Sequence, residues 1–351
     1  MSTEQTKSQH SLNRSIVVSL LLVLALVAAL FVKDGIAQQT KVNNVDGYYL
    51  ADSSFYHQKG TNPGEEVYSG PESILSFSLT HSHALLVTSA QKILLVDLAS
   101  GKSEDITTPG CSVLQTSSAF DRYFVYLNSC DTDTTAQRFV SYDTQTNKET
   151  TTEVQASSQW QVNPKTGNVV YQAGLTSTVY SGNMDKSGQW QPFVQLGQMG
   201  YLGGFYNKGN TLFLWGTEAD ASTPISYNLN DLNTVKLVLP EAADSKTQIA
   251  SGTTAIDRTS ILWAVTAYSP EEDAYYEYVI KDTNLGATLL VDLSTLGYTL
   301  GNRLSYDAKN DVVAIPVTQY NGGDVSTLFA DAETGKILYQ LQFTTAFQFA
   351  P

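Results

Sequence analysis

Asp97-Leu-Ala-Ser-Gly-Lys102 is a polar turn between two short apolar stretches, and similar turns recur along the chain at intervals of roughly 42 to 54 residues. The other five are Asp143-Thr-Gln-Thr-Asn-Lys148, Asp185-Lys-Ser-Gly188, Asn228-Leu-Asn-Asp231, Asp282-Thr-Asn-Leu-Gly286 and Asp331-Ala-Glu-Thr-Gly-Lys336. Before each turn lies a second apolar hairpin, as in Phe77-Ser-Leu-Thr-His-Ser-His-Ala-Leu-Leu-Val87. One such unit is too small to bury a core alone, so neighbouring units must stack.

Two hairpins per repeat make four strands, and strand-only repeats of this length are typical of the blades of a β-propeller. The pattern resembles the β-propeller superfamily, which includes the WD-repeat, YVTN-repeat and quinoprotein-like families. This resemblance implies a fold and no particular activity, and the Trp-Asp pair of WD repeats is absent. The sequence therefore predicts an all-β propeller of four-stranded blades in a single domain, residues 38–351.

The number of blades depends on the two ends of the propeller domain. A further turn at Asp52 is expected to have residues 48–51 as its third strand and residues 65–68 as its fourth. The chain stops at Ala346-Phe-Gln-Phe-Ala-Pro351, which resembles a first strand without successors. Propellers avoid open edges by completing one blade from both termini. We therefore predict seven blades closed in this way, with six as the alternative.

Residues 1–37 are predicted to form a hydrophobic targeting helix. Arg14 precedes an uncharged apolar run over residues 15–32, and small residues lie near Ala37, where a signal peptidase would cleave. The run also approaches the length of a membrane-spanning helix. Signal peptide and uncleaved signal anchor remain alternatives, and both predict a secreted or extracytoplasmic propeller.

Net charge restricts the classes of partner. The chain carries a formal charge of −14, and 15% of its residues are charged. Nucleic acids and anionic membrane surfaces attract Lys and Arg, so neither is an expected partner. Contact with a membrane is expected only through the N-terminal segment, if it is not cleaved.

The two cysteines are predicted to form a disulfide. Cys111 and Cys130 flank a hairpin whose turn is expected near Phe120 and Asp121, so simple antiparallel pairing sets the cysteines opposite each other. Such a bond agrees with export from the cytosol. Two unrelated buried thiols are the alternative.

The sequence contains few candidates for catalysis. His81 and His83 lie two residues apart in an expected turn, where they would bind a metal or remain solvated turn residues. The motifs of serine hydrolases, zinc proteases, phosphate loops and dinucleotide sites are all absent. No catalytic residue is assigned.

Acidic residues are expected to gather on one face of the propeller. We call this the loop face: it carries the connections between the second and third strands of each blade and the connections between blades. The opposite face, with the remaining connections, is the turn face. The acidic residues expected on the loop face are Asp131, Asp133, Glu218, Asp220, Glu271, Glu272, Asp273 and Asp324. Clustered carboxylates suit Ca²⁺ or a cationic partner, and an acidic surface that is merely solvated is the alternative.

Two functions from different classes agree with these observations. The first is a non-enzymatic binding protein that recognises a protein or glycan through its loop face. The second is an extracellular hydrolase or lyase, with carboxylates and a divalent metal at the mouth of the channel. The expected inner strands, such as residues 73–78 and 157–162, offer Ser, Gln and apolar residues with little Asp, Glu or His. Binding is therefore the preferred hypothesis.

Overall fold

A computed structural model describes the protein from residue 37 to residue 351, with gaps. The residues left out are 115–117, 131–136, 155–156, 164–165, 175, 185–189, 207–210, 218–219, 229–233, 237–246, 256–259, 270–272, 284–285, 302 and 321. The predicted targeting segment lies outside the described residues up to residue 36.

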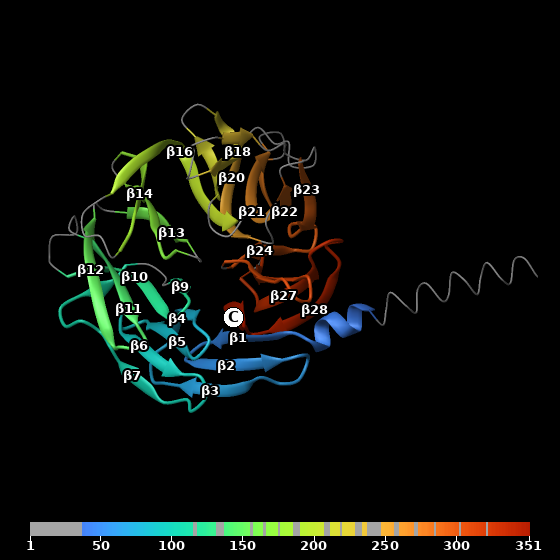
Figure 1. Ribbon diagram of the computed structural model, residues 1–351. Coiled ribbons are helices and arrows are strands. Elements are labelled where there is room, and N and C mark those ends of the chain that lie inside the picture. The colour runs from blue at the N-terminus through green and yellow to red at the C-terminus, as the bar shows by residue number, and fades with distance from the viewer. Residues whose placement is uncertain are drawn as a thin grey trace, which may run out of the picture.

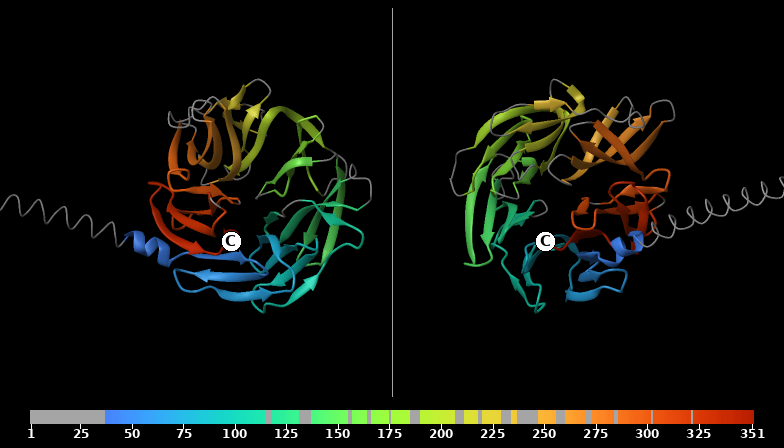
Figure 2. Two further views of the ribbon diagram at one scale, coloured as in Figure 1. Left: turned by 180° about the vertical axis from the view of Figure 1, so that it is seen from behind. Right: turned by 45° about the vertical axis from the view of Figure 1, so that its right-hand side comes forward.

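The described strands form six antiparallel sheets arranged as blades in a ring (Figures 1 and 2). The all-β propeller expected from the repeats is therefore confirmed. The C-terminus lies on the inner side of the ring, close to β1 (Figure 1).

One blade is built from both ends of the propeller, as predicted, with strand order β29-β1-β2-β3. Its strands are β1 Asp46–Ala51, β2 Ser54–Lys59, β3 Glu65–Ser69 and β29 Ala346–Phe349. Tyr49 lies opposite Phe347 in the pairing of β1 with β29. Because β29 supplies the innermost strand, residues 48–51 belong to the second strand and not to the third. Asp52 therefore lies on the loop face, which corrects its expected position.

The next two blades follow the expected order from the inner to the outer strand. The first contains β4 Ile74–Leu79, β5 His83–Thr88, β6 Ile93–Asp97 and β7 Ser103–Asp105. The second contains β8 Ser112–Val113, β9 Ser118–Phe120, β10 Tyr123–Ser129, β11 Gln137–Asp143 and β12 Lys148–Val154. Here β8 and β9 both pair with β10 and together occupy the inner position.

The largest sheet has seven strands, and it explains why the structure has six sheets where the sequence predicted seven blades. Its strands are β13 Ser157–Val162, β14 Val169–Ala173, β15 Thr178–Gly182, β16 Gln191–Tyr206, β17 Thr211–Thr217, β18 Asp220–Asn228 and β19 Thr234–Lys236. The first part of β16 pairs with β15, and the rest pairs with β17. Two four-stranded units thus share one strand, because the connection between them is itself extended. Six sheets therefore replace the seven separate blades that we expected.

The last two blades complete the ring. One contains β20 Thr247–Ala255, β21 Ser260–Ser269, β22 Ala274–Thr283 and β23 Gly286–Asp292. The other contains β24 Tyr298–Leu300, β25 Ser305–Asp307, β26 Val312–Gln319, β27 Val325–Asp331 and β28 Ile337–Gln342. β24 and β25 both pair with β26.

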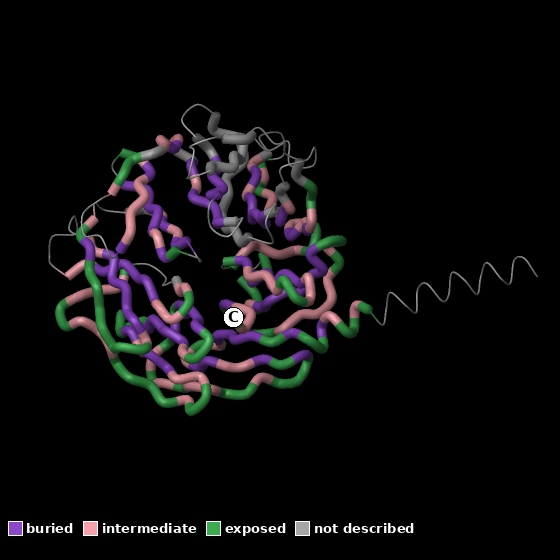
Figure 3. Tube along the Cα trace, viewed as in Figure 1, coloured by how far each residue is buried: buried purple, intermediate pink, exposed green. Residues whose placement is uncertain are grey.

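The hydrophobic core lies between neighbouring blades (Figure 3). Second strands such as β5 and β26 are buried over most of their length, whereas all three residues of the outer strand β7 are exposed. Trp215 of the largest sheet packs edge-on against Trp263 of the next blade, with ring centroids 5.4 Å apart. Aromatic packing of this kind joins strands that belong to different sheets.

Two of the recurring Asp residues, Asp97 and Asp331, have a structural role in their turns. Asp97 accepts hydrogen bonds from the backbone and hydroxyl of Ser100, both at 2.7 Å. These bonds, with the hydroxyl contributing most, lower the pKa of the Asp97 carboxyl. Asp331 makes the same contacts with Thr334. In these turns, Asx hydrogen bonding replaces a backbone bond and lets the chain reverse.

A short helical segment, residues 37–43, precedes β1 and attaches to the turn face of the last blade. Lys41 lies 2.6 Å from Asp331 and 3.7 Å from Asp311, and Lys336 donates to Gln38 at 2.7 Å. Val42 of this segment and Val45, just after it, are buried. No helix among the described residues is both long and apolar enough to cross a membrane.

Candidate functional site

Two of the acidic residues predicted on the loop face have described side chains, and both lie on that face. Asp273 lies exposed between β21 and β22, and Asp324 lies exposed just before β27. Asp220 begins β18. Asp131, Asp133, Glu218, Glu271 and Glu272 lie outside the described residues.

Coordination of Ca²⁺ by these carboxylates stays a prediction. Among the residues described, no three His, Cys, Asp or Glu side chains gather closely enough to hold a metal ion. On the turn face, His83 instead contacts Ser82 at 2.8 Å and lies 3.9 Å from Asp97.

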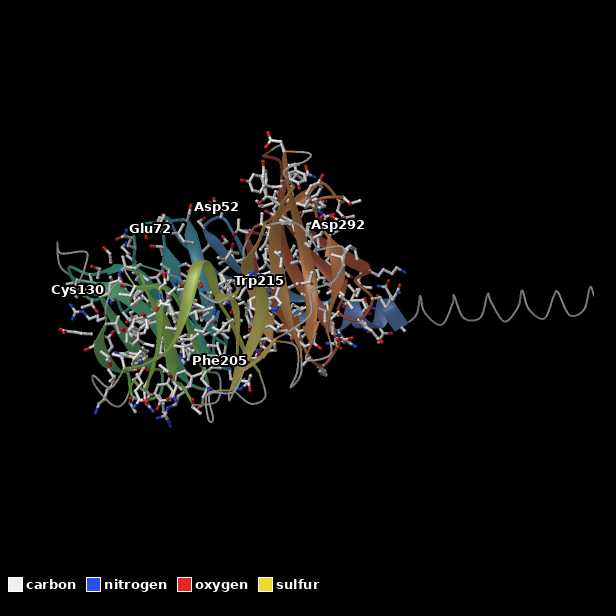
Figure 4. The ribbon with its side chains drawn as sticks, turned by 90° about the horizontal axis from the view of Figure 1, so that it is seen from above. Asp52, Glu72, Cys130, Phe205, Trp215 and Asp292 are labelled. Carbon is white, nitrogen blue, oxygen red and sulfur yellow. A yellow bond between two sulfur atoms is a disulfide. The ribbon has the colours of Figure 1, made fainter. Side chains whose placement is uncertain are left out.

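The two faces differ in how their carboxylates are paired. Five of the six ion pairs found within the described ranges lie toward the turn face, including Arg122 with Asp143 at 3.0 Å. The sixth, Lys92 with Glu72 at 2.7 Å, lies on the loop face. Figure 4 shows Asp52, Glu72 and Asp292 toward one side of the ring and Phe205 toward the other. Asp273, Asp292 and Asp324 take part in none of these six pairs.

Exposed apolar side chains mark the loop face more clearly than its acids do. The described residues include seven large hydrophobic side chains that are exposed, and all except Leu289 of the outer strand β23 lie on this face. The six are Leu75, Leu114, Tyr275, Leu296, Tyr320 and Phe343. Our sequence analysis missed them. Apolar residues inside otherwise polar connections, such as Tyr320 before Asn-Gly-Gly, were the available signal.

Three of these side chains lie at the junction of the last two blades, and we call Tyr275, Leu296 and Tyr320 the tyrosine patch. Tyr275 packs on Tyr268, with ring centroids 4.9 Å apart, and Tyr268 donates to Asp273 at 2.8 Å. Tyr320 donates to the hydroxyl of Ser294 at 2.7 Å. Both patch tyrosines are therefore held in place by contacts within the protein.

Glu277 lies beneath the tyrosine patch and connects the two blades. Its carboxylate accepts a hydrogen bond from the backbone of Leu300, while its own backbone N–H donates to Ser294 at 2.7 Å. Burial raises the pKa of the Glu277 carboxyl, although the bond from Leu300 opposes this effect. This half-buried side chain reaches the neighbouring blade, so it acts as a structural link.

The raised pKa of Glu277 predicts a pH dependence of stability. Its contribution should be fully present below the ordinary pKa of a glutamate and should be lost as pH rises through the folded-state value, because the buried carboxylate then ionises. Glu277→Gln keeps an oxygen acceptor for Leu300 and cannot ionise. Denaturant unfolding between pH 4 and pH 8 should therefore show the stability of wild type falling relative to this variant.

Glu277→Ala provides the control, because it leaves the Leu300 N–H without its acceptor. We expect it to be less stable than Glu277→Gln throughout this pH range. Parallel pH profiles for wild type and Glu277→Gln would refute the assignment of the pH dependence to this carboxyl.

The inner strands carry amide side chains that tie neighbouring units together around the channel. Gln159 accepts a hydrogen bond from the backbone of Leu202 at 2.7 Å, and Gln348 donates to the backbone oxygen of Phe77 at 3.1 Å. These contacts give the glutamines of the inner strands a structural role. This arrangement agrees with the expectation that the inner strands contain mainly Ser, Gln and apolar residues.

The predicted disulfide is present between Cys111 and Cys130. Val113 and Ser112 pair with Asn128 and Ser129, so the next opposed pair is the two cysteines. The hairpin turn itself lies at Asp121 and Arg122, one residue later than expected, with Phe120 opposite Tyr123. The register changes by two residues between these paired segments and restores the opposition of the cysteines.

Comparison with known proteins identifies a fold without a family. No family model matches the chain, and no curated protein matches it. An oligogalacturonate lyase in complex with manganese has a TM-score of 0.57 at 12% identity, covering 75% of this chain and 79% of that one. A quinoprotein alcohol dehydrogenase-like protein from Bacteroides thetaiotaomicron has a TM-score of 0.54 at 12% identity, covering 88% and 79%.

A third similar structure is TolB from Acinetobacter baumannii, with a TM-score of 0.52 at 14% identity, covering 89% of this chain and 67% of that one. Identities this low carry the fold and not the activity. The chain is therefore a β-propeller similar in fold to TolB, quinoprotein-like and lyase structures, and no family is assigned to it.

Proposed function

We propose that the protein is a non-enzymatic binding protein located outside the cytosol, which recognises a protein or glycan through its loop face. The observation that carries this proposal is the gathering of six of the seven exposed large hydrophobic side chains on that face. Three of the six, Tyr275, Leu296 and Tyr320, lie around one connection between blades, and exposed apolar groups that cluster in this way mark interaction sites.

The attachment of the N-terminal segment leaves the loop face accessible. Lys41 and Gln38 contact Asp331 and Lys336 on the turn face. Gln38 and Lys41, which directly follow the predicted targeting segment, therefore lie on the side of the propeller opposite the loop face. An anchored protein would thus keep its loop face available to a ligand.

An extracytoplasmic location is supported by two independent features. The apolar run over residues 15–32 has the character of an export signal. The Cys111–Cys130 bond belongs to a class that persists in oxidising compartments.

Site-specific photo-crosslinking in the cells that make the protein tests this proposal. A photoreactive amino acid replaces Tyr320 on the loop face or, as the matched control, Lys309 on the turn face. We expect covalent adducts from position 320 and few or none from position 309. Adducts from position 309 alone, or equal yields from both positions, would contradict recognition through the loop face.

A further inference from the structure

The tyrosine patch presents large apolar groups to solvent at one junction between blades. Tyr275 is 66% exposed, Tyr320 is 47% exposed and Leu296 is 46% exposed. Tyr275 and Glu277 are two residues apart on β22, so they point to the same side of the sheet, about 7 Å apart along the strand. Because Glu277 reaches Leu300 of the last blade, Tyr275 faces that blade as well.

Hydrogen bonds through Ser294 connect the other members to this position. Ser294 accepts from the backbone of Glu277 and from the hydroxyl of Tyr320. Leu296 lies two residues further along the same connection, residues 293–297. The three side chains therefore surround one short loop, and contacts within the protein hold the two tyrosine rings in place before any ligand binds. Pre-ordered side chains lose less conformational freedom on binding.

The carboxylates around this patch give it a negative charge. Asp273 precedes Tyr275 by two residues, Asp324 follows Tyr320 by four residues, and Asp292 directly precedes the connection of residues 293–297. Asp292 accepts from the backbone and hydroxyl of Thr295, at 2.9 and 2.6 Å, and Asp273 accepts from Tyr268. These donors are neutral, so they leave the negative charge in place. Within the described residues, none of the three carboxylates has a Lys, Arg or His within ion-pair distance.

Aromatic rings beside carboxylates are chemically complementary to guanidinium and ammonium groups. A cation over a tyrosine ring interacts with the negative face of the ring, and arginine also stacks on it through its planar surface. A nearby carboxylate adds a charge-assisted hydrogen bond. An acidic or neutral segment would gain none of these interactions.

We infer that the tyrosine patch binds a cationic, arginine-containing segment of a protein partner, with its side chains over Tyr275 and Tyr320 and its charges facing Asp273 and Asp324. This inference rests on the proposed function and specifies its ligand. It selects a protein partner over a glycan, because an uncharged sugar would leave the acidic groups uncompensated.

Direct titration of the full-length protein with charged peptides tests the inference. The probe is a fluorescent (Arg-Gly)6 peptide, compared with (Glu-Gly)6 and (Gly-Ser)6 peptides of equal length. We expect binding of the arginine peptide alone, weakening as salt screens the charges. The double variant Tyr275→Ala/Tyr320→Ala should weaken that binding by roughly tenfold or more, as two cation–ring contacts are lost.

Three further variants separate the role of the rings from general effects on the loop face. Phe343→Ala removes an exposed ring of the same face outside the patch and should leave affinity unchanged. Tyr320→Phe keeps the ring without its hydroxyl and should retain most of the affinity. Asp273→Asn/Asp324→Asn should weaken binding and reduce its salt dependence.

Several outcomes would overturn the inference. These are equal affinity for the arginine and glutamate peptides, unchanged affinity in the double tyrosine variant, and displacement of the arginine peptide by a neutral oligosaccharide. Adducts from position 320 together with absent peptide binding would refute this inference alone, and the proposed function would stand.

Discussion

Phe347→Ala is expected to lower the free energy of unfolding by about 3–5 kcal/mol, the usual cost of removing a buried phenylalanine. Phe347 is 2% exposed and packs edge-on against Phe329, with ring centroids 4.9 Å apart. It belongs to a core cluster that joins the last blade to the blade built from both ends of the propeller. The substitution therefore leaves a cavity at the point where the ring closes.

The tight packing around Phe347 supports so large an effect. Gly47, on the neighbouring strand β1, lies against the ring of Phe347. A Cβ added at Gly47 would meet this ring and would come within 2.6 Å of the backbone oxygen of Gln348. Surroundings packed to this density relax only in part around a deleted side chain, which adds a cavity cost to the lost burial.

Phe343→Ala is the matched control, since it makes the same substitution four residues earlier. Phe343 is 65% exposed, so its loss should change the free energy of unfolding by less than about 0.5 kcal/mol. Denaturant titration followed by tryptophan fluorescence measures both variants. Equal stability of the two variants would show that β29 does not close the ring in solution.

Removal of the Cys111–Cys130 bond is expected to destabilise the protein by about 3 kcal/mol, because the bond closes a loop of about 20 residues and restricts the unfolded chain. The bond joins the inner strand of its blade to β10, at the end of the register set by Ser112 and Ser129. Reductant should therefore lower the melting temperature of the protein.

Cys111→Ser/Cys130→Ser is the control for this experiment. Its melting temperature should be lower than that of oxidised wild type and should not respond to reductant. Peptide mapping without reduction should find the two cysteines linked in wild type. Two free thiols in wild type purified without reductant, or the same response to reductant in the double variant, would contradict the role assigned to the bond.

The local pattern of the sequence was sufficient to predict the repeat, the disulfide and the closure of the ring. The turns at Asp97 and Asp331 can be predicted from the sequence, because an Asx turn needs only a few consecutive residues. Ala346–Phe349 was identifiable as a strand without neighbours, and its pairing with β1 followed from the cost of an open edge. These features depend on residues close in sequence or on a rule that holds for any ring of blades.

Contacts between blades decided the rest, because they bring together residues that no short pattern relates. The union of two units through β16 depends on how far an extended strand continues, which its composition does not specify. The burial of Glu277 depends on Leu300 in another blade. The sequence predicted the connections that carry Asp273 and Asp324 on the loop face but misplaced Asp52. Only the tertiary structure selected Tyr275, Leu296 and Tyr320 as exposed neighbours, since exposure depends on what packs over each side chain.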